Sequence, residues 1–309
     1  MKKSKKAGGK EPLRRFLRGS ALVLLLALIS LYVLMPAGVG LFALMRHPSV
    51  AGDPPDGFQS VHVTASDGVE LAAWHHHGSN DDVILVLHGA TASRAEVRPV
   101  AEALAEAGFG VLAPDLRGHG ESGGRGVPAY GWRGTEDVKA CLAWIDKEDD
   151  AAAIGGYGAS LGGEILLGAS SDCPEIQAIV ADGATYRSLS DYLAVPSRKS
   201  LWRSFTTRLL FSTVRLFGGE AEPKRLFDAM ATSRDTAFLL IEAGSVTREA
   251  EYGDILAASA PDRVAQWLIP GIGHVEGHAA MPDAYEEKIL TFLTARLGVV
   301  ESQSGNGGQ

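Results

Sequence analysis

A serine between glycines is the first feature of this sequence that could carry chemistry. Gly158-Ala159-Ser160-Leu161-Gly162 begins at the last residue of the apolar run AAIGGYG and leads into a helical pattern. Flanking glycines permit a sharp strand-to-helix turn that exposes the serine hydroxyl. An exposed hydroxyl at such a turn is typical of a nucleophile that forms a covalent acyl intermediate. The structural alternative is that Ser160 only caps the helix that follows it.

A histidine near the C-terminus is placed to activate this hydroxyl. His274 lies in the segment PGIGHVEGH, directly after the apolar run at 263–270. From a glycine-rich loop at a strand end, an imidazole can reach across to Ser160 and act as its general base. His278, in the same segment, is the alternative base.

Two backbone amides could stabilise the negative charge that develops on a substrate oxygen. His88-Gly89-Ala90 ends the first buried strand, predicted from the apolar run VILVLH. The amide of Ala90 could therefore join that of Leu161 in an oxyanion hole. His119, in the segment DLRGHGES, is expected to fix a tight turn rather than to react.

Buried strands that alternate with helices are expected to position these groups. SVHVTA and VELAAWHH alternate around Ser66-Asp67-Gly68 and predict an antiparallel hairpin. Short apolar runs, as expected of strands buried on both faces, follow at 83–88, 110–115, 152–158, 176–182, 237–243 and 263–270. Helical patterns lie at 96–107, 134–146, 160–169, 247–258 and 283–297. This order predicts a mostly parallel sheet with helices on both faces.

A long interruption, at about 184–236, separates two of the predicted parallel strands. It is too long for a plain connection and contains helical patterns of its own, which predicts a helical lid. Within it, residues 192–219 include five basic residues and no acidic one, interleaved with aromatic and aliphatic side chains. This stretch is either a lid helix with one face in water or a surface that rests on anionic lipid.

An uncharged segment near the N-terminus is long enough to cross a bilayer. No residue from Gly19 to Met45 is charged, and about 20 apolar residues in a helix span a hydrocarbon core of about 30 Å. The basic residues before it are expected to stay in the cytoplasm, which places the rest of the chain on the other side. The alternative is a cleavable signal peptide, but its apolar region would be shorter, with a small-residue cleavage site.

These features divide the chain into five segments. We expect a basic cytoplasmic head at 1–18, a transmembrane anchor at 19–45, a Pro/Gly-rich tether at 46–57, one domain at 58–298 and a disordered tail at 299–309. The head carries +7 of a net charge of −8, so the remainder carries −15, which excludes nucleic acid as a partner. The two cysteines, Cys141 and Cys173, predict neither a disulfide framework nor a zinc site.

Four motifs in this order resemble those of the α/β-hydrolase fold. HGATASR, DLRGHGESGG, GYGASLGG and PGIGH are similar to motifs of bacterial serine esterases and of serine aminopeptidase-like hydrolases of the S33 type. The resemblance covers about 60–297 and implies a Ser-His-acid triad that transfers an acyl group to water. Ser160 and His274 occupy the matching positions.

The acid of the triad departs from the family pattern. The resemblance implies an Asp three residues after Gly244, but that position holds Thr247, which carries no charge. Glu249 is the favoured replacement, because it lies nearest and its longer side chain could offset part of the shift. The alternatives, among which geometry must decide, are Asp182, Glu251 and Asp254.

Neither a metal nor a nucleotide cofactor is expected. Consecutive strand residues point to alternate faces, so the histidines at 75–77 cannot all bind one ion. The glycines around Ser160 do not open a dinucleotide-binding unit. Glu136 and Asp137, in the first turn of a predicted helix, are expected to complement its dipole.

The sequence therefore predicts a membrane-anchored serine hydrolase. The first hypothesis is an esterase or lipase, with a small-molecule acyl substrate and the lipid bilayer as partners. An amidase or aminopeptidase would use the same groups on an amide. The missing Asp also leaves open a catalytically silent hydrolase fold that serves as a binding module.

Overall fold

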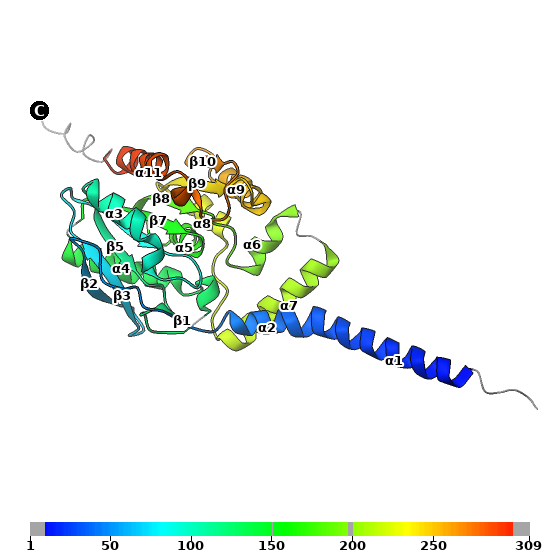
Figure 1. Ribbon diagram of the computed structural model, residues 1–309. Coiled ribbons are helices and arrows are strands. Elements are labelled where there is room, and N and C mark those ends of the chain that lie inside the picture. The colour runs from blue at the N-terminus through cyan, green and yellow to red at the C-terminus, as the bar shows by residue number, and fades with distance from the viewer. Residues whose placement is uncertain (1–9, 126, 150, 197–199, 299–309) are drawn as a thin grey trace, which may run out of the picture.

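The computed structural model describes residues 10–125, 127–149, 151–196 and 200–298. They form a layered body from which one long helix projects (Figure 1). Half of the expected basic head and the whole expected tail, residues 1–9 and 299–309, lie outside the described residues. The same holds for Arg198 and Lys199 of the basic stretch.

An eight-stranded sheet forms the centre of the body. Its strands follow the order β10-β9-β8-β7-β4-β5-β3-β2 (Figure 1). The predicted hairpin is made by β2 (Gln59–Thr64) and β3 (Glu70–His76), and β3 also pairs antiparallel with β5. All other pairings are parallel and join β4 (Asp82–Leu87), β5 (Gly110–Pro114), β7 (Ala153–Ala159), β8 (Ile176–Asp182), β9 (Ala237–Ala243) and β10 (Val264–Ile269). The predicted mostly parallel sheet is confirmed.

Helices cover both faces of this sheet, each over its own hydrophobic cluster. On one face, α4 (Gly134–Glu148) and α5 (Leu161–Ala169) bury Ile145 and Leu166. On the other face, α3 (Arg98–Glu106) and α11 (Pro282–Leu297) bury Leu104 and Leu293. Packing from both sides explains why the strand sequences are continuously apolar. The other described helices around this sheet are α9 (Thr247–Ser259), α10 (Gly277–Ala280) and two short 3-10 helices, Arg94–Val97 and Pro128–Tyr130.

Among its described residues, the long connection between β8 and β9 contains three α-helices. They are α6 (Leu189–Ala194), α7 (Leu201–Gly218) and α8 (Leu226–Thr232). Ser188 starts α6, because its Oγ accepts a hydrogen bond from the Asp191 amide at 3.0 Å. α8 packs against α5, whereas α7 lies beside the N-terminal helix (Figure 1).

The N-terminal helix runs from Lys10 to Phe42. α1 (Lys10–Ile29) passes through a π-helical segment, Ser30–Leu34, into α2 (Met35–Phe42). Its most apolar window has a mean hydropathy of 2.5 and is only 6% buried. By length and composition alone, this helix could cross a membrane. It begins before Gly19, where the anchor was expected to start, and its end is packed against α7.

The segment at 46–57, expected to be a Pro/Gly-rich tether, is hydrogen-bonded to the body near its start. β1 (His47–Pro48) pairs in parallel with β6 (His119–Gly120). His47 N–H donates to the Gly118 carbonyl at 2.7 Å, and Ser49 N–H donates to the Gly120 carbonyl at 3.1 Å. A pairing over two residues leaves no periodic pattern, which is why it was not predicted from the sequence.

A buried ion pair joins the hairpin turn and α4 to the loop after β5. The guanidinium of Arg117 donates to Asp137 at 3.0 and 3.1 Å and to Asp67 at 2.8 Å. The side chains of Arg117 and Asp137 are 6% and 8% exposed. The expectation that Asp137 serves the helix dipole was therefore incomplete, because its carboxylate also neutralises a buried cation.

Asp137→Ala should lower the free energy of unfolding by about 3 kcal/mol or more, because it leaves a buried guanidinium without its main carboxylate. Lys139→Ala is a matched control on the same helix. It removes an exposed ion pair with Glu136 and should cost less than about 1 kcal/mol. Urea unfolding followed by circular dichroism measures both. Equal losses in the two variants would contradict the importance of the buried pair.

Candidate active site

Ser160 lies in a strained turn between β7 and α5. Its φ of 49° and ψ of −112° are values that residues other than glycine rarely adopt. A side chain at Gly158 would collide with the backbone of Gly162, and one at Gly162 would collide with the Leu87 carbonyl. The two glycines therefore allow the close packing that holds the turn. Ser160 makes no capping hydrogen bond to α5, which favours an exposed, available hydroxyl over a helix cap.

His274 reaches this serine from the loop after β10. Ser160 Oγ and His274 Nε2 are 2.9 Å apart. The loop is held by Gly273 N–H, which donates to the Glu276 carboxylate at 2.8 Å. Val275, with a φ of 57°, turns the chain directly after the histidine. The structure thus brings together two side chains that are separated by more than a hundred residues in sequence.

Glu249 extends this pair into a chain of hydrogen bonds. His274 Nδ1–H donates to Glu249 Oε1 at 2.6 Å, and Ala243 N–H, at the end of β9, donates to Glu249 Oε2 at 2.7 Å. The Glu249 side chain is 1% exposed, whereas that of His274 is 48% exposed. The hydrogen bond to Glu249 raises the pKa of His274 above its usual value of 6.5, although burial acts in the opposite direction.

The other candidate acids lie elsewhere. Asp182 accepts a hydrogen bond from the Tyr285 hydroxyl at 2.6 Å, and burial raises its pKa to about 6. On α9, Asp254 is exposed and Glu251 is half-buried. Within the described ranges, the carboxylate that is hydrogen-bonded to the imidazole is that of Glu249.

Two other histidines that the sequence singled out have separate partners. His278 Nε2 lies 2.8 Å from Glu286 Oε1, so the alternative base is engaged with α11 instead of the serine. His119 Nδ1–H donates to the Arg117 carbonyl at 3.1 Å, inside the turn that it was expected to fix. Burial lowers the pKa of His119 to about 4.

The loop after β4 brings Ala90 to the site. Ala90 and Leu161 line the same cavity as Ser160. Just before Ala90, Gly89 N–H donates to Glu96 Oε2 at 2.6 Å, which fixes the course of the loop. Glu96 was assigned only to a helical pattern in the sequence, because nothing local indicates that its carboxylate reaches back to this loop.

A cavity of about 350 Å³ opens at the serine, within the range of small-molecule sites. Besides Ser160, His274 and Glu249, its wall includes three tyrosines, one arginine and one further glutamate, namely Tyr130, Tyr186, Tyr252, Arg248 and Glu164. The arrangement can therefore enclose a small substrate whose reactive group lies at the serine.

Glu164 is a residue of this cavity that the sequence analysis missed. Its side chain is buried on α5, four residues after Ser160. Glu164 Oε1 accepts hydrogen bonds from the Thr185 amide at 3.0 Å, the Thr185 hydroxyl at 2.9 Å and the Tyr186 amide at 2.9 Å. These bonds tie the helix after the serine to the connection that follows β8. Burial raises the pKa of Glu164 to about 7. An acidic residue in an otherwise apolar, buried helix was the available signal.

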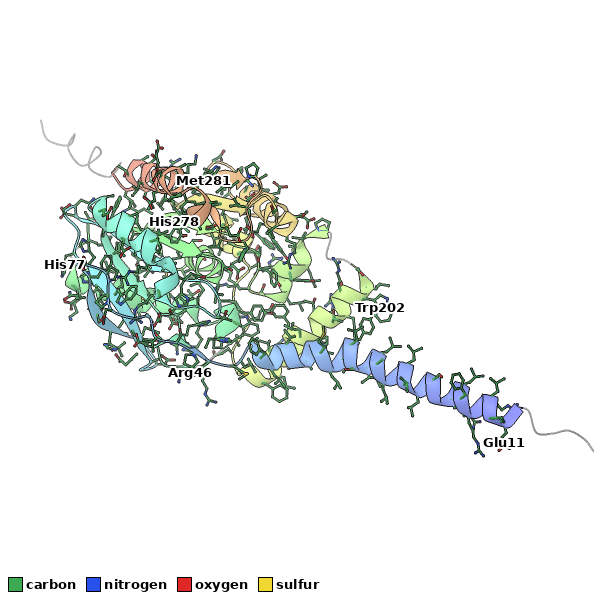
Figure 2. The ribbon with its side chains drawn as sticks, viewed as in Figure 1. Glu11, Arg46, His77, Trp202, His278 and Met281 are labelled. Carbon is green, nitrogen blue, oxygen red and sulfur yellow. The ribbon has the colours of Figure 1, made fainter. Side chains whose placement is uncertain are left out.

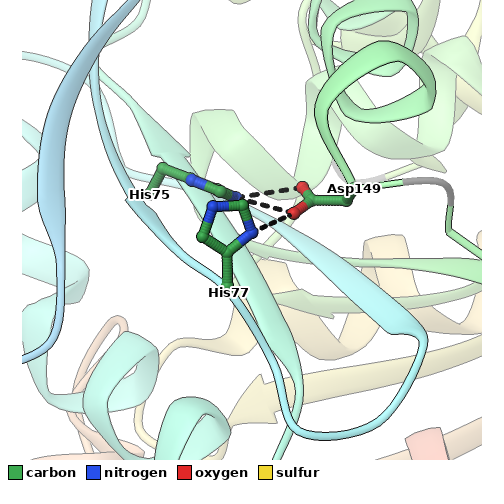
Figure 3. Close-up of side chains that lie close together, drawn as sticks. All are labelled: His75, His77 and Asp149. Carbon is green, nitrogen blue, oxygen red and sulfur yellow. Dashed lines mark hydrogen bonds and ion pairs between the residues drawn. The ribbon is translucent and has the colours of Figure 1, made fainter.

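A cluster of histidines lies at the end of the sheet opposite to Ser160. β3 ends where β5 begins, whereas the serine follows the end of β7. There Asp149 accepts hydrogen bonds from His75 Nε2–H and from His77 Nδ1–H, both at 2.9 Å (Figure 3). Of the groups within the described ranges, these three residues could hold a metal, since their ligand atoms lie within 4.8 Å of one another. His76 instead bonds a backbone carbonyl at 3.0 Å, as the alternation of strand side chains predicts.

Comparison with known proteins identifies the family. The family model for serine aminopeptidase, S33, matches residues 78–239, which is more than half of the chain. An uncharacterized protein of Mycobacterium tuberculosis is 24% identical over 261 residues, which is 80% of this chain and 83% of the relative. An uncharacterized 31.7 kDa protein of Escherichia coli is 34% identical over 123 residues. That match covers 38% of this chain and 42% of the relative, so it spans less than half of the relative's length.

Solved structures share the fold. A Pyrococcus furiosus esterase has a TM-score of 0.63 and 26% identity, over 82% of this chain and 100% of its own. Est1E from Butyrivibrio proteoclasticus, solved with ferulic acid bound, has a TM-score of 0.59 and 16% identity, over 77% of this chain and 99% of its own. At 16% identity, the similarity to Est1E shows a shared fold alone. The family match, the sheet and these structures confirm the resemblance carried by the four sequence motifs, and the chain therefore belongs to the serine aminopeptidase, S33, family of α/β-hydrolases.

Proposed function

We propose that the chain is a serine hydrolase in which Ser160 is the nucleophile, His274 the general base and Glu249 the acid. The observation that carries this proposal is the chain of hydrogen bonds from Ser160 through His274 to Glu249, at 2.9 and 2.6 Å. His274 takes the hydroxyl proton as Ser160 attacks an acyl carbon, and Glu249 orients and stabilises the imidazolium. The amides of Ala90 and Leu161 bind the oxyanion. Water then releases the acyl group.

An ester is the substrate class that we favour. The Pyrococcus furiosus relative is an esterase, and aromatic side chains line the cavity. The second candidate is an amidase or aminopeptidase, because the same groups cleave amides and the family is described as serine aminopeptidase. The hypothesis of a silent binding module rested on Thr247. It is weakened because the contact between Glu249 and His274 provides the charge that a threonine lacks.

We also propose that α1 and α2 anchor this hydrolase in a membrane. Their apolar side chains are exposed along the helix, for example Leu24 at 61% and Phe42 at 53%. Contact of this much apolar surface with water is unfavourable, whereas contact with lipid chains is not. Arg14, Arg15 and Arg18 precede the uncharged stretch and favour a cytoplasmic N-terminus. The catalytic body then lies on the opposite side of the membrane.

Ser160→Ala should lower ester hydrolysis by at least about 10⁴-fold while the fold is retained, because the nucleophile is lost. A fluorophosphonate probe should label the parent protein and not this variant. Ser66→Ala, at an exposed hairpin position, is the control that keeps the label. Ester hydrolysis by Ser160→Ala at the parental rate would show that Ser160 is not the nucleophile. Peptide and amide substrates tested in parallel decide between the two enzyme candidates.

Glu249→Gln should lower kcat strongly, by up to about 10⁴-fold, with little change in substrate binding. Because only neutral His274 can accept the proton, parental kcat/KM should fall as the pH drops through a midpoint above 6.5. Without the carboxylate this midpoint should move to lower pH. Glu251→Gln is the matched control on the same helix and should keep the parental pH profile. Parental behaviour of Glu249→Gln would point to a Ser-His dyad.

The proposed topology predicts where a protease can act. Protease added outside intact cells should digest the body at 58–298, whereas the N-terminal arginines should be reached only after permeabilisation. Immunoblots against an epitope at each end of the chain measure both events. Protection of the body in intact cells would reverse the assigned orientation.

A further inference from the structure

Exposed apolar side chains of the body are concentrated on α7. After Met45, seven large hydrophobic residues of the described chain are exposed, and five of them lie on this helix. They are Leu201 at 87%, Trp202 at 65%, Phe205 at 48%, Leu216 at 75% and Phe217 at 64%. Such a patch on one element marks a surface that contacts an apolar partner.

The N-terminal helix lies directly beside this patch. A side chain at Gly40 would come within 2.8 Å of the Leu210 carbonyl, so the two helices are in close backbone contact. The rings of Tyr32 and Trp202 are 5.1 Å apart, and Figure 2 shows Trp202 over the middle of the long helix. The exposed surface of α7 therefore continues the exposed surface of the proposed anchor.

The length of the anchor sets the depth of this contact. If the hydrocarbon core begins at Gly19, a rise of about 1.5 Å per residue places Tyr32 about 20 Å into a core of about 30 Å. Trp202, in contact with Tyr32, then lies within the half of the bilayer next to the body.

Arginines border the apolar face of α7. Successive residues of a helix are rotated by about 100°, so Leu201, Phe205 and Leu216 lie within about 60° of one another around the helix axis. Arg208 and Arg215 lie on one side of this face, within about 40° of Leu201. Both arginines are exposed. Long basic side chains at this position can reach phosphate groups while their stems stay in an apolar phase.

The inner face of α7 leads to the catalytic cavity. Phe211 and Val214 are buried there with Ala43, from the segment after α2. The ring of Phe211 lies 5.0 Å from that of Tyr130, and Tyr130 lines the cavity at Ser160. One helix thus contacts the proposed anchor, presents exposed apolar residues and packs against a wall of the active site.

We propose that the first part of α7, from Leu201 to Leu210, lies in the half of the bilayer next to the body, with Arg215 and Leu216 at the headgroup level beside the end of α2, and that α7 admits an acyl ester of a membrane lipid to Ser160. This inference rests on the proposed anchoring and hydrolase function. Hydrolysis breaks the ester C–O bond through the acyl-serine. The proton that His274 takes from Ser160 completes the released alcohol. Water then attacks the acyl-serine and supplies the hydroxyl of the released fatty acid, and its other proton restores the Ser160 hydroxyl through His274.

The test uses the full chain in vesicles of phosphatidylcholine and phosphatidylglycerol. A variant with Leu201→Ser, Phe205→Ser and Leu216→Ser should hydrolyse vesicle-embedded 4-methylumbelliferyl oleate about tenfold more slowly, since lost apolar burial weakens lipid contact. Its rate on water-soluble 4-methylumbelliferyl butyrate should stay within about twofold of the parent. Leu268→Ser, exposed on β10, is the control. Equal rates on oleate in the triple variant and the parent would overturn the proposal.

A second measurement does not depend on activity. Lipids with brominated acyl chains should quench tryptophan fluorescence in the parent, and Trp202→Phe should remove most of that quenching. Quenching by Trp202 without turnover of either ester supports the placement of α7 and refutes the hydrolase function. Hydrolysis of both esters without quenching refutes the placement and leaves α7 as a surface for another protein.

Discussion

The positive φ at Ser160 is the constraint on which the rest of the site depends. Such a conformation costs about 1–3 kcal/mol and persists only where the surroundings determine it. Here Ser160 N–H donates to the Asp182 carbonyl at 2.6 Å, and Gly158 and Gly162 allow α5 to pack closely on β7 and β4. Asp182, once a candidate acid, thus supports the turn through its backbone. The loops that carry the imidazole and the carboxylate converge on this one exposed hydroxyl.

Glu249 shows how a carboxylate reaches the imidazole although the chain departs from the family pattern. α9 begins at Thr247, the position where the resemblance implied an Asp. Glu249 lies in the first turn of this helix, and its longer side chain returns to the end of β9, where the Ala243 amide donates to it. Its second oxygen then accepts from His274. A carboxylate therefore contacts the imidazole from this strand end, although Thr247 cannot provide one.

The sequence predicted those parts of the molecule that leave a local pattern. Strands buried on both faces gave continuous apolar runs, and Ser160 and His274 were predicted from their settings at strand ends. Glu249 was favoured over three alternatives because it lies nearest the position that the family resemblance implied. Contacts between distant segments leave no such pattern. The pairing of β1 with β6 spans two residues, Glu96 reaches back to Gly89 through a side chain, and Gly40 meets Leu210 between separate helices. Each depends on the assembled fold, so single-residue propensities could not indicate it.

The pairing of β1 with β6 also limits how the body can move relative to the N-terminal helix. Only four residues lie between the end of α2 at Phe42 and the start of β1 at His47. Ala43 is buried, and the Arg46 guanidinium donates to the Ser122 carbonyl at 2.8 Å. The short, hydrogen-bonded connection therefore restricts rotation of the body relative to the N-terminal helix. Any partner that binds or tilts this helix would rotate the cavity at Ser160 with it, so the orientation of the helix sets the direction in which this cavity faces.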